Sequence, residues 1–322
     1  MKNLEKDSVL LEVKSLEKTF RQRKGGGDTN ALRGLSFKIL KGQTFGLVGE
    51  SGCGKTTAAR TIIGIHKPTG GEIWFDGKEI GKMDEKEMKP LRKRMQMIFQ
   101  DPSGALNPRM RICDSIREPL DIQNIGTDSN RIKRVEELLE IVGLSSKHAM
   151  RYPHEFSGGQ RQRIGIARAL APEPEFIICD EPLSALDLSV QAQTVNMLED
   201  LKRDAQLTYL FIAHDLSMVK HISDRIGVMH MGRMVEQADS DELYANPAHP
   251  YTKALLSSML PLDAEKYSIN VHEDDEGLLE GICLKGCGFR KKCPLAKGIC
   301  AEEFPEMKNI GGDHYCACHA LD

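Results

Sequence analysis

Short apolar runs separated by glycine-rich turns mark the first 80 residues of the chain. The runs are Leu10–Val13, Leu35–Ile39 and Glu72–Phe75, and glycines gather at Gly25–Gly27 and Gly70–Gly71. Runs of this length, bounded by turn residues, are typical of β-strands. We therefore expect an antiparallel sheet in the N-terminal part of the chain.

Between about Pro102 and Leu170 the apolar positions follow a longer period. They recur at spacings of three and four residues, which places them on one face of an α-helix. The clearest case comprises Ile132, Val135, Leu138, Leu139 and Val142. We expect residues 102–170 to form a helical subdomain.

Strand-like runs return in the second half of the chain, at Glu175–Cys179, Thr208–Ala213 and Ile226–Met229. A helical stretch, Val190–Lys202, separates the first two. Strands that alternate with helices indicate a parallel sheet. The whole pattern predicts an α/β fold.

The composition changes past Pro261. An acidic stretch, Glu273–Glu276, leads into a segment that holds six of the nine cysteines, from Cys283 to Cys318. A chain of 322 residues can form one substantial domain with an appendage. We expect a main domain at residues 1–260, and an acidic linker with a cysteine-rich extension at 261–322.

The charge balance and the apolar runs narrow the possible partners. The 44 basic and 47 acidic residues give a net charge of −3, so we expect no nucleic-acid partner. The N-terminus lacks the apolar stretch of a secretory signal, and no apolar run approaches the 18 residues of a membrane-spanning helix. We expect a cytosolic chain, so that any membrane role requires partner subunits.

A phosphate-binding loop follows the apolar run Phe45–Val48. The segment Gly49-Glu50-Ser51-Gly52-Cys53-Gly54-Lys55-Thr56 fits the pattern G-x-x-x-x-G-K-[ST] and leads into a predicted helix. Glycines allow backbone N–H groups to converge on phosphate oxygens, Lys55 binds the β- and γ-phosphates, and Thr56 offers a hydroxyl to Mg²⁺. This loop alone would suit a GTPase, a kinase or a helicase equally well.

Two carboxylates end the apolar strand Phe176–Cys179. Asp180 suits a Mg²⁺ ion through its water shell, and Glu181 can polarise an attacking water molecule. Acidic residues at the end of a strand can also serve solvation alone. Their place after a P-loop favours a role in nucleotide hydrolysis.

The segment Phe156-Ser157-Gly158-Gly159-Gln160 opens a predicted helix, with Ser157 as its N-cap. It resembles the signature sequence of the ABC ATPase family. Other family elements follow in order: Phe20 as the aromatic beside adenine, Gln100 of the Q-loop, Ser184–Asp187 as the D-loop and His214 as the switch histidine. A lone aromatic at a strand end, such as Phe20, more often serves packing.

The resemblance implies a P-loop NTPase core with an antiparallel β-subdomain, a helical subdomain and a C-terminal extension. It also implies that two subunits enclose two ATP molecules. The catalytic residues would then be Glu181 and His214. Mg²⁺ would be bound by Thr56, Gln100 and Asp180. Ser157, Gly158, Gly159, Gln160 and Asp187 would contact the ATP of the opposite subunit. The ATP contacts within the subunit would be Phe20, Gly49, Glu50, Ser51, Gly52, Cys53, Gly54, Lys55, Thr56, Thr57 and Gln100.

A narrower resemblance covers nearly the whole chain. Phe99–Pro102, Ala105–Arg109 and His249–Leu256 look like segments of the dipeptide, oligopeptide and nickel importer group, and Tyr152–Arg163 looks like its F-type ATPase subunit. This implies a peripheral protein on the cytoplasmic face of the membrane. Its partners would be a second, different ATPase, two permease subunits and, indirectly, an extracytoplasmic solute-binding protein.

The sequence leaves the exact task of the ATPase open. Dipeptides, oligopeptides and nickel or metallophore complexes all fit as cargo. A soluble ABC ATPase for cytosolic assembly would also lack membrane spans, but it would not need His249–Leu256 or the cysteine-rich tail. A non-catalytic ATP-binding module is disfavoured by the presence of both Glu181 and His214.

The cysteine spacing is Cys287-x5-Cys293-x6-Cys300-x17-Cys318. From the spacing alone, four thiolates suit an iron–sulfur cluster or a Zn²⁺ ion equally, and free thiols remain an alternative. The tail resembles the extension of the importer group, some members of which carry a [4Fe-4S] cluster. The resemblance therefore implies such a cluster on these four residues, with Cys283 and Cys316 as possible substitutes.

Overall fold

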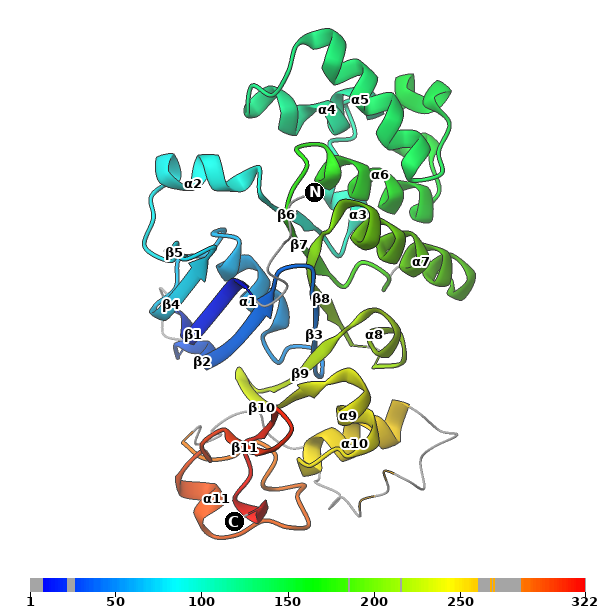
Figure 1. Ribbon diagram of the computed structural model, residues 1–322. Coiled ribbons are helices and arrows are strands. Elements are labelled where there is room, and N and C mark those ends of the chain that lie inside the picture. The colour runs from blue at the N-terminus through cyan, green and yellow to red at the C-terminus, as the bar shows by residue number, and fades with distance from the viewer. Residues whose placement is uncertain are drawn as a thin grey trace.

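The computed structural model describes residues 8–21, 27–184, 186–214, 216–259, 267, 269 and 285–321. Figure 1 shows an elongated arrangement of three parts. The two sheets occupy the middle, helices α4 and α5 lie at one end, and the C-terminal segment with β11 and α11 lies at the other. The expected α/β architecture is confirmed.

The N-terminal sheet is antiparallel, as predicted, with strand order β2-β1-β4-β5. Leu11, Val13 and Leu16 of its central strand are buried against the P-loop half of the molecule. The strands are longer than the apolar runs because polar residues on the outer face continue the pairing. Their bounds are β1 Val9–Phe20, β2 Thr29–Leu40, β4 Gly70–Phe75 and β5 Lys78–Glu79.

The main sheet has eight strands in the order β11-β12-β10-β9-β3-β8-β7-β6. The run from β9 to β6 is parallel, as the alternation of strands and helices predicted. Their largely apolar and mostly buried sequences suit strands covered on both faces. The bounds are β3 Thr44–Val48, β6 Met95–Ile98, β7 Phe176–Asp180, β8 Thr208–Ala213, β9 Arg225–His230, β10 Arg233–Asp239, β11 Lys308–Gly311 and β12 His314–Cys316.

Residues 102–170 form helices and 3₁₀ turns, the structure that their spacing predicted. One detail of the sequence pattern is wrong: Val135, Leu138, Leu139 and Val142 are buried, but Ile132 is 53% exposed. The predicted face therefore begins one turn later. The subdomain comprises α3 Pro102–Ala105, α4 Ile112–Ile122, α5 Asp128–Ile141, the 3₁₀ turns Ser146–Met150 and Pro153–Glu155, and α6 Gly158–Leu170.

The remaining helices connect the strands and cover the sheet. The helix expected at Val190–Lys202 is α7, which is longer because Asp187 caps its start. These helices are α1 Lys55–Ile62, α2 Glu85–Arg92, α7 Leu188–Ala205, α8 Leu216–Ile222, α9 Ser240–Ala245, α10 Pro250–Met259 and α11 Ile299–Glu302, with a last 3₁₀ turn at His319–Leu321.

The cysteine-rich extension continues the main sheet. Strand β12 pairs with β10 of the ATPase half, and β11 pairs with β12. Cys287, Phe289, Cys293 and Cys300 belong to the same buried apolar cluster as the sheet and the helical subdomain. The extension therefore shares its core with the main domain. The acidic stretch Glu273–Glu276 lies outside the described residues.

A buried carboxylate fastens the extension to the sheet. Glu236 of β10 is fully buried and accepts hydrogen bonds from the backbone N–H groups of Ala248 (2.6 Å) and His249 (2.9 Å). Its Oε1 also lies 2.7 Å from Nε2 of His314 in β12. Burial by itself lowers the pKa of His314, but the hydrogen bonds and charges of Glu236 and Glu242 outweigh it and raise that pKa. The pair therefore favours a protonated His314.

We expect Glu236→Ala to lower the free energy of unfolding by about 3–5 kcal/mol, because the change leaves a buried histidine and two N–H groups without their acceptor. Urea denaturation followed by circular dichroism measures this quantity. Glu242→Ala is the control. Glu242 lies 3.5 Å from Nδ1 of His314 with its side chain 41% exposed, so its loss should cost less than about 1 kcal/mol. Equal effects of the two substitutions would contradict the anchoring role of Glu236.

Candidate functional site

The predicted phosphate-binding loop lies between β3 and α1, in the strand–loop–helix context that the sequence indicated. Gly54 caps α1 with a φ of 110°, and Gly49 leaves β3 with a φ of 155°. A Cβ atom on Gly49 would lie 2.1 Å from the carbonyl oxygen of Met229, and one on Gly54 would lie 2.5 Å from that of Ala31. The loop therefore needs glycine at both positions to pack against β2 and β9.

The parallel register brings the predicted catalytic residues to the same edge of the sheet. Val48 lies beside Ala213, and Asp180 lies beside Ile212. The residues that follow these positions, Gly49, Glu181 and His214, consequently leave the sheet at neighbouring points. Ligands of open α/β sheets bind at this carboxyl edge.

Three predicted site residues surround the carboxylate of Glu181. Its carboxylate lies 3.9 Å from Lys55 Nζ and 3.7 Å from His214 Nδ1, and it accepts a hydrogen bond of 2.7 Å from Gln100 Nε2. Its φ is 46°, in the left-handed region that side-chain-bearing residues seldom occupy. Backbone strain of this kind persists where the surroundings hold it, and it concentrates at active sites.

Asp180 is almost fully buried beside the loop. Its Oδ1 accepts a hydrogen bond of 2.9 Å from Thr56 Oγ1, whereas its Oδ2 is buried without a hydrogen-bond partner. Burial raises the pKa of Asp180, and the hydrogen bond from Thr56 partly opposes that rise. An unpartnered carboxylate oxygen next to the Thr56 hydroxyl is a donor set that fits Mg²⁺.

A cleft of about 1110 Å³ opens over the loop. The predicted residues Phe20, Lys55, Gln100 and Glu181 line it, together with Ser51–Thr57. The Phe20 side chain is 36% exposed, and its ring meets His66 edge-on at 5.3 Å. The sequence did not predict eight further lining residues, because no local motif marks them: Gly27, Asp28, Thr29, Asn30, Ala31, Arg33, Met231 and Gly232.

The residues predicted to contact ATP across a subunit interface lie elsewhere. The described lining of the cleft includes neither Ser157–Gln160 nor Asp187. Ser157 caps α6 in a capping box with Gln160, as expected. The carboxylate of Asp187 caps α7 by accepting from the N–H of Val190 at 3.0 Å, a local function that the sequence analysis missed. Ala185 lies outside the described residues.

The four predicted cysteine ligands are free thiols, three of them buried and Cys318 half-buried. Within the described part of the chain, no group of three or more His, Cys, Asp or Glu side chains is arranged to hold a metal ion. Cys283 lies outside that part. Of the four sulfurs, that of Cys300 accepts the backbone N–H of Lys297 at 3.5 Å. Burial raises the pKa of the thiols of Cys287, Cys293 and Cys318.

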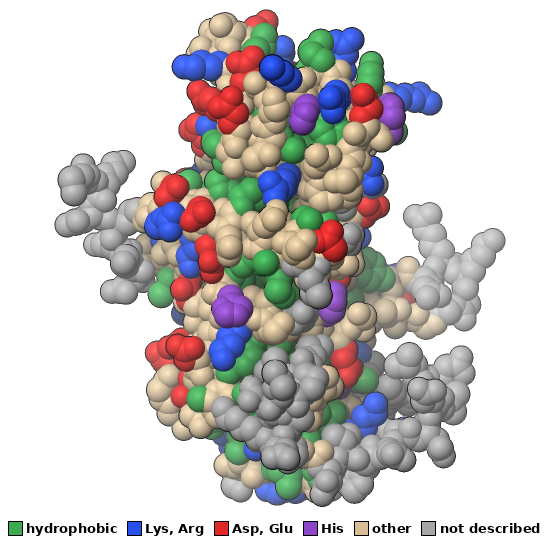
Figure 2. Space-filling model, turned by 90° about the vertical axis from the view of Figure 1, so that its right-hand side faces the viewer, with side chains coloured by type: hydrophobic (Ala, Val, Ile, Leu, Met, Phe, Trp, Pro, Cys, Tyr) green, Lys and Arg blue, Asp and Glu red, His purple; other side chains and the backbone are tan. Residues whose placement is uncertain are grey.

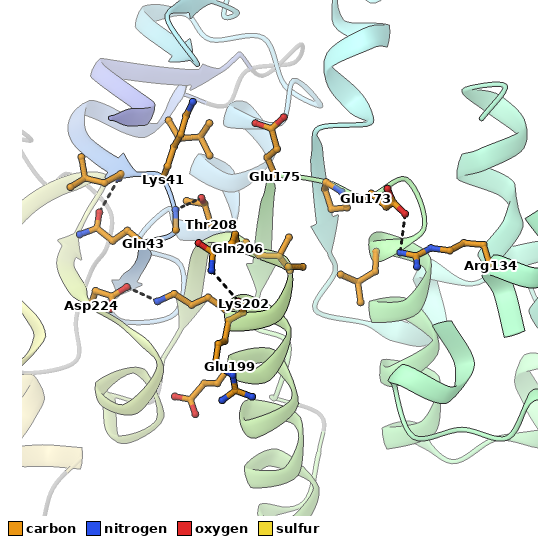
Figure 3. A pocket seen from close by; sticks show the side chains of 18 residues that line it. Lys41, Gln43, Arg134, Glu173, Glu175, Glu199, Lys202, Gln206, Thr208 and Asp224 are labelled. Atoms are coloured by element: carbon orange, nitrogen blue, oxygen red, sulfur yellow. Dashed lines mark hydrogen bonds and ion pairs between the residues drawn. The ribbon is translucent and has the colours of Figure 1, made fainter. Parts of the chain in front are cut away.

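A second cavity, of about 870 Å³, lies at the opposite edge of the sheet (Figure 3). Gln43 and Thr208 line it where β3 and β8 begin. Four of its charged residues form ion pairs: Lys202 lies 2.6 Å from Asp224, and Arg134 lies 3.7 Å from Glu173. None of the predicted site residues lines this cavity.

On the face shown in Figure 2, the coloured Lys and Arg side chains are interspersed with Asp and Glu, so no continuous basic surface is seen there. Among the described residues, none of the helices has the length and apolar character needed to cross a bilayer.

Comparisons with known proteins agree with this geometry. Residues 32–184 match the family model "ABC transporter", and residues 235–300 match "Oligopeptide/dipeptide transporter, C-terminal region". The chain is 50% identical over 323 residues to "Oligopeptide transport ATP-binding protein AppF" of Bacillus subtilis (strain 168), with 97% of both chains covered. It is 56% identical over 279 residues to OppF of the same organism, covering 83% of this chain and 90% of that one.

Solved structures are similar as well. A dimeric post-hydrolysis state of the ATP-binding cassette MJ0796 bound to ADP and Pi superposes with a TM-score of 0.66 at 28% identity. That match covers 72% of this chain and 99% of the cassette. The cbiO1 subunit of Clostridium perfringens gives a TM-score of 0.66 at 27% identity, over 82% of this chain and 100% of that one.

We expect Gly49→Ala to weaken nucleotide binding at least about tenfold, because the new methyl group would push the loop away from β9. Titration with a fluorescent ATP analogue measures the dissociation constant. Gly42→Ala is the control, since Gly42 has a φ of 75° but a Cβ there would meet no atom within 4 Å. A loop that tolerates alanine at position 49 with unchanged affinity would refute the packing argument.

Proposed function

Because this chain belongs to the family of ABC transporter ATP-binding proteins, it is an ATP hydrolase, and we propose that hydrolysis powers the import of di- or oligopeptides. Two comparisons support peptides as the cargo. Relatives that match almost the whole chain carry the words "oligopeptide transport" in their names, and residues 235–300 match the C-terminal region of such transporters. The second match also favours an importer over an ATPase for cytosolic assembly.

The observation that carries the proposal is the position of Glu181. Lys55, Gln100 and His214 surround its carboxylate, at the edge of the sheet where the phosphate-binding loop begins. A carboxylate held in this way can orient a water molecule and accept its proton. Glu181 is therefore the general base, and His214 stabilises the charge that develops on the transferred phosphoryl group.

The phosphate-binding loop and the buried carboxylate of Asp180 bind different parts of Mg·ATP. The loop amides and Lys55 hold the phosphates, and Phe20 borders the part of the cleft that takes the adenine. Thr56, Asp180 and Gln100 hold Mg²⁺, which neutralises phosphate charge when bound. The unpartnered Oδ2 of Asp180 supports this assignment.

A second ATPase subunit completes each site. Ser157–Gln160 form the N-terminus of α6, where backbone N–H groups can receive an anion, yet they do not line the cleft of their own chain. These residues, with Asp187, contact the ATP bound by the partner subunit. The F-type resemblance favours a different chain as that partner. Closure of the pair around ATP and its opening after hydrolysis form the power stroke.

The permease subunits dock beside the Q-loop. A cavity of about 350 Å³ opens between β6 and α6, and Ile65 and Phe99 are exposed on its lining. Since Gln100 contacts Glu181 next to Phe99, a movement of the docked permease reaches the hydrolytic site directly. The chain would thus be a peripheral protein on the cytoplasmic face, reached by the solute-binding protein only through the permeases.

The extension carries a [4Fe-4S] cluster on Cys287, Cys293, Cys300 and Cys318. The resemblance of the tail to the extension of the importer group supports this proposal. The sulfur of Cys300 also accepts the backbone N–H of Lys297, a hydrogen bond of the kind that tunes iron–sulfur centres. A Zn²⁺ ion is the other metal that four thiolates would suit, and iron, sulfide and zinc analysis separates the two. The cluster would fix the extension to the ATPase core.

We expect Glu181→Gln to lower the rate of ATP hydrolysis by at least about 10², with ATP affinity preserved, because glutamine keeps the shape but cannot accept the proton. Steady-state phosphate release and ATP titration measure the two quantities. Glu175→Gln, at the amino end of the same strand, is the matched control and should retain normal turnover. Unchanged hydrolysis by Glu181→Gln would exclude this residue as the base.

We expect anaerobically purified protein to be brown and to contain about four iron and four sulfide per chain. Cys293→Ser should bleach it, whereas Cys113→Ser, in α4 of the helical subdomain, should not. Visible absorption and iron and sulfide analysis provide the measurements. Colourless protein with stoichiometric zinc would overturn the cluster and leave the ATPase assignment unaffected.

A further inference from the structure

The first peptide of the phosphate-binding loop is held from both sides. The N–H of Glu50 donates to the hydroxyl oxygen of Tyr251 at 3.0 Å, and the carbonyl of Gly49 accepts from Lys55 Nζ at 2.7 Å. These two groups belong to one peptide unit, whose N–H and C=O point in opposite directions when it is trans. Tyr251 lies 201 positions after Glu50 in the chain. Its hydrogen bond therefore fixes the orientation of the Gly49–Glu50 peptide, whose carbonyl group binds Lys55.

Tyr251 is itself rigidly placed. It lies in the first turn of α10 and is only 1% exposed. Its ring centroid is 4.2 Å from that of His230 and 5.5 Å from that of Phe289. Burial raises the pKa of Tyr251 well above its ordinary value, so the hydroxyl remains protonated at neutral pH. The ring can move only if these neighbours move.

One of these neighbours belongs to the cysteine-rich extension. Phe289 lies between Cys287 and Cys293 and is buried against Tyr251 and His230. The backbone of this segment approaches closely because residue 288 is glycine: a Cβ there would lie 2.7 Å from the sulfur of Met231.

The same segment reaches the loop by a second path. Met231 and Gly232 line the nucleotide cleft, and the N–H of Gly232 donates to the carbonyl of Cys53 in the loop at 2.8 Å. The extension thus approaches the phosphate-binding loop at two points, at Glu50 through Tyr251 and at Cys53 through Met231 and Gly232.

We propose that Tyr251 is a positioning residue for the phosphate-binding loop, and that the extension sets the affinity for ATP through the contact of Phe289 with Tyr251. The proposal rests on the proposed ATPase function. Its physical basis is preorganisation: a loop already held in its binding conformation loses less conformational freedom when the phosphates arrive. Any event that shifts the segment from Cys287 to Cys293, such as a change at its thiols, would then change nucleotide affinity.

The direct test is Tyr251→Phe in the full chain, which keeps the packed ring and removes only the acceptor of the Glu50 N–H. The dissociation constant for Mg·ATP, measured by isothermal titration calorimetry, should rise about tenfold, which corresponds to about 1.4 kcal/mol. KM should rise by a similar factor while kcat changes little, because Glu181, Gln100 and His214 do not contact the released peptide.

Tyr209→Phe is the matched control. Its hydroxyl is also buried and donates to the carbonyl of Leu198 at 3.2 Å, away from the loop. This variant should lose stability without a change in ATP affinity. Equal shifts in affinity from both substitutions, or wild-type affinity in Tyr251→Phe, would overturn the proposal.

A double-mutant cycle tests the path from the extension. Phe289→Leu should weaken Mg·ATP binding in the wild-type background and have little further effect in the Tyr251→Phe background, because both changes release the same peptide. Additive effects would show that Phe289 acts elsewhere and would reject this path. A wild-type protein that binds no ATP would instead refute the proposed function itself, so the two failures can be told apart.

Discussion

The parallel pairing of β8 with β3 on one side and β7 on the other is the constraint from which the site follows. It sets Val48 beside Ala213 and Asp180 beside Ile212, so the chain leaves three strands within reach of one phosphate group. Residues from segments more than a hundred positions apart in sequence therefore surround the carboxylate of Glu181. The glycines of the loop are required by the same arrangement, since the strand next to β3 leaves no room for a Cβ at Gly49.

Residues that belong to local motifs were predictable from the sequence. The loop Gly49–Thr56, the acidic pair at the end of β7 and His214 after β8 all stand at fixed offsets from apolar strands, and the strands form where expected. Contacts between distant segments were not predictable. The sequence around Tyr251 does not show that its hydroxyl contacts the phosphate-binding loop. The sequence around Glu236 does not show that its carboxylate contacts His314 of β12. Such pairs depend on tertiary packing, for which local period and spacing carry no signal.

Errors in the pattern analysis have the same origin. Ile132 satisfies the helical spacing, yet it is exposed, because the spacing identifies one face of α5 but not where the packing against that face begins. Asp187 was assigned to a subunit interface, and its carboxylate also serves as the N-cap of α7, so one side chain would combine a local and an intermolecular contact. For the cysteines, the sequence gives the number and spacing of the thiols but not their positions in the folded chain. The burial that raises the pKa of Cys287, Cys293 and Cys318 became apparent only from the folded structure.

The two strands at the end of the chain also change how the molecule meets its own copies. Without them, β10 would present an open row of N–H and C=O groups next to buried Met234 and Val235, a template for pairing with another chain. Strand β12 occupies that row. The new outer strand, β11, is only four residues long, is exposed throughout, and ends in Gly311, so it offers a poor surface for further addition. Strands β11 and β12 thus protect the edge of β10, and a chain truncated before β11 would expose that edge to pairing with another copy.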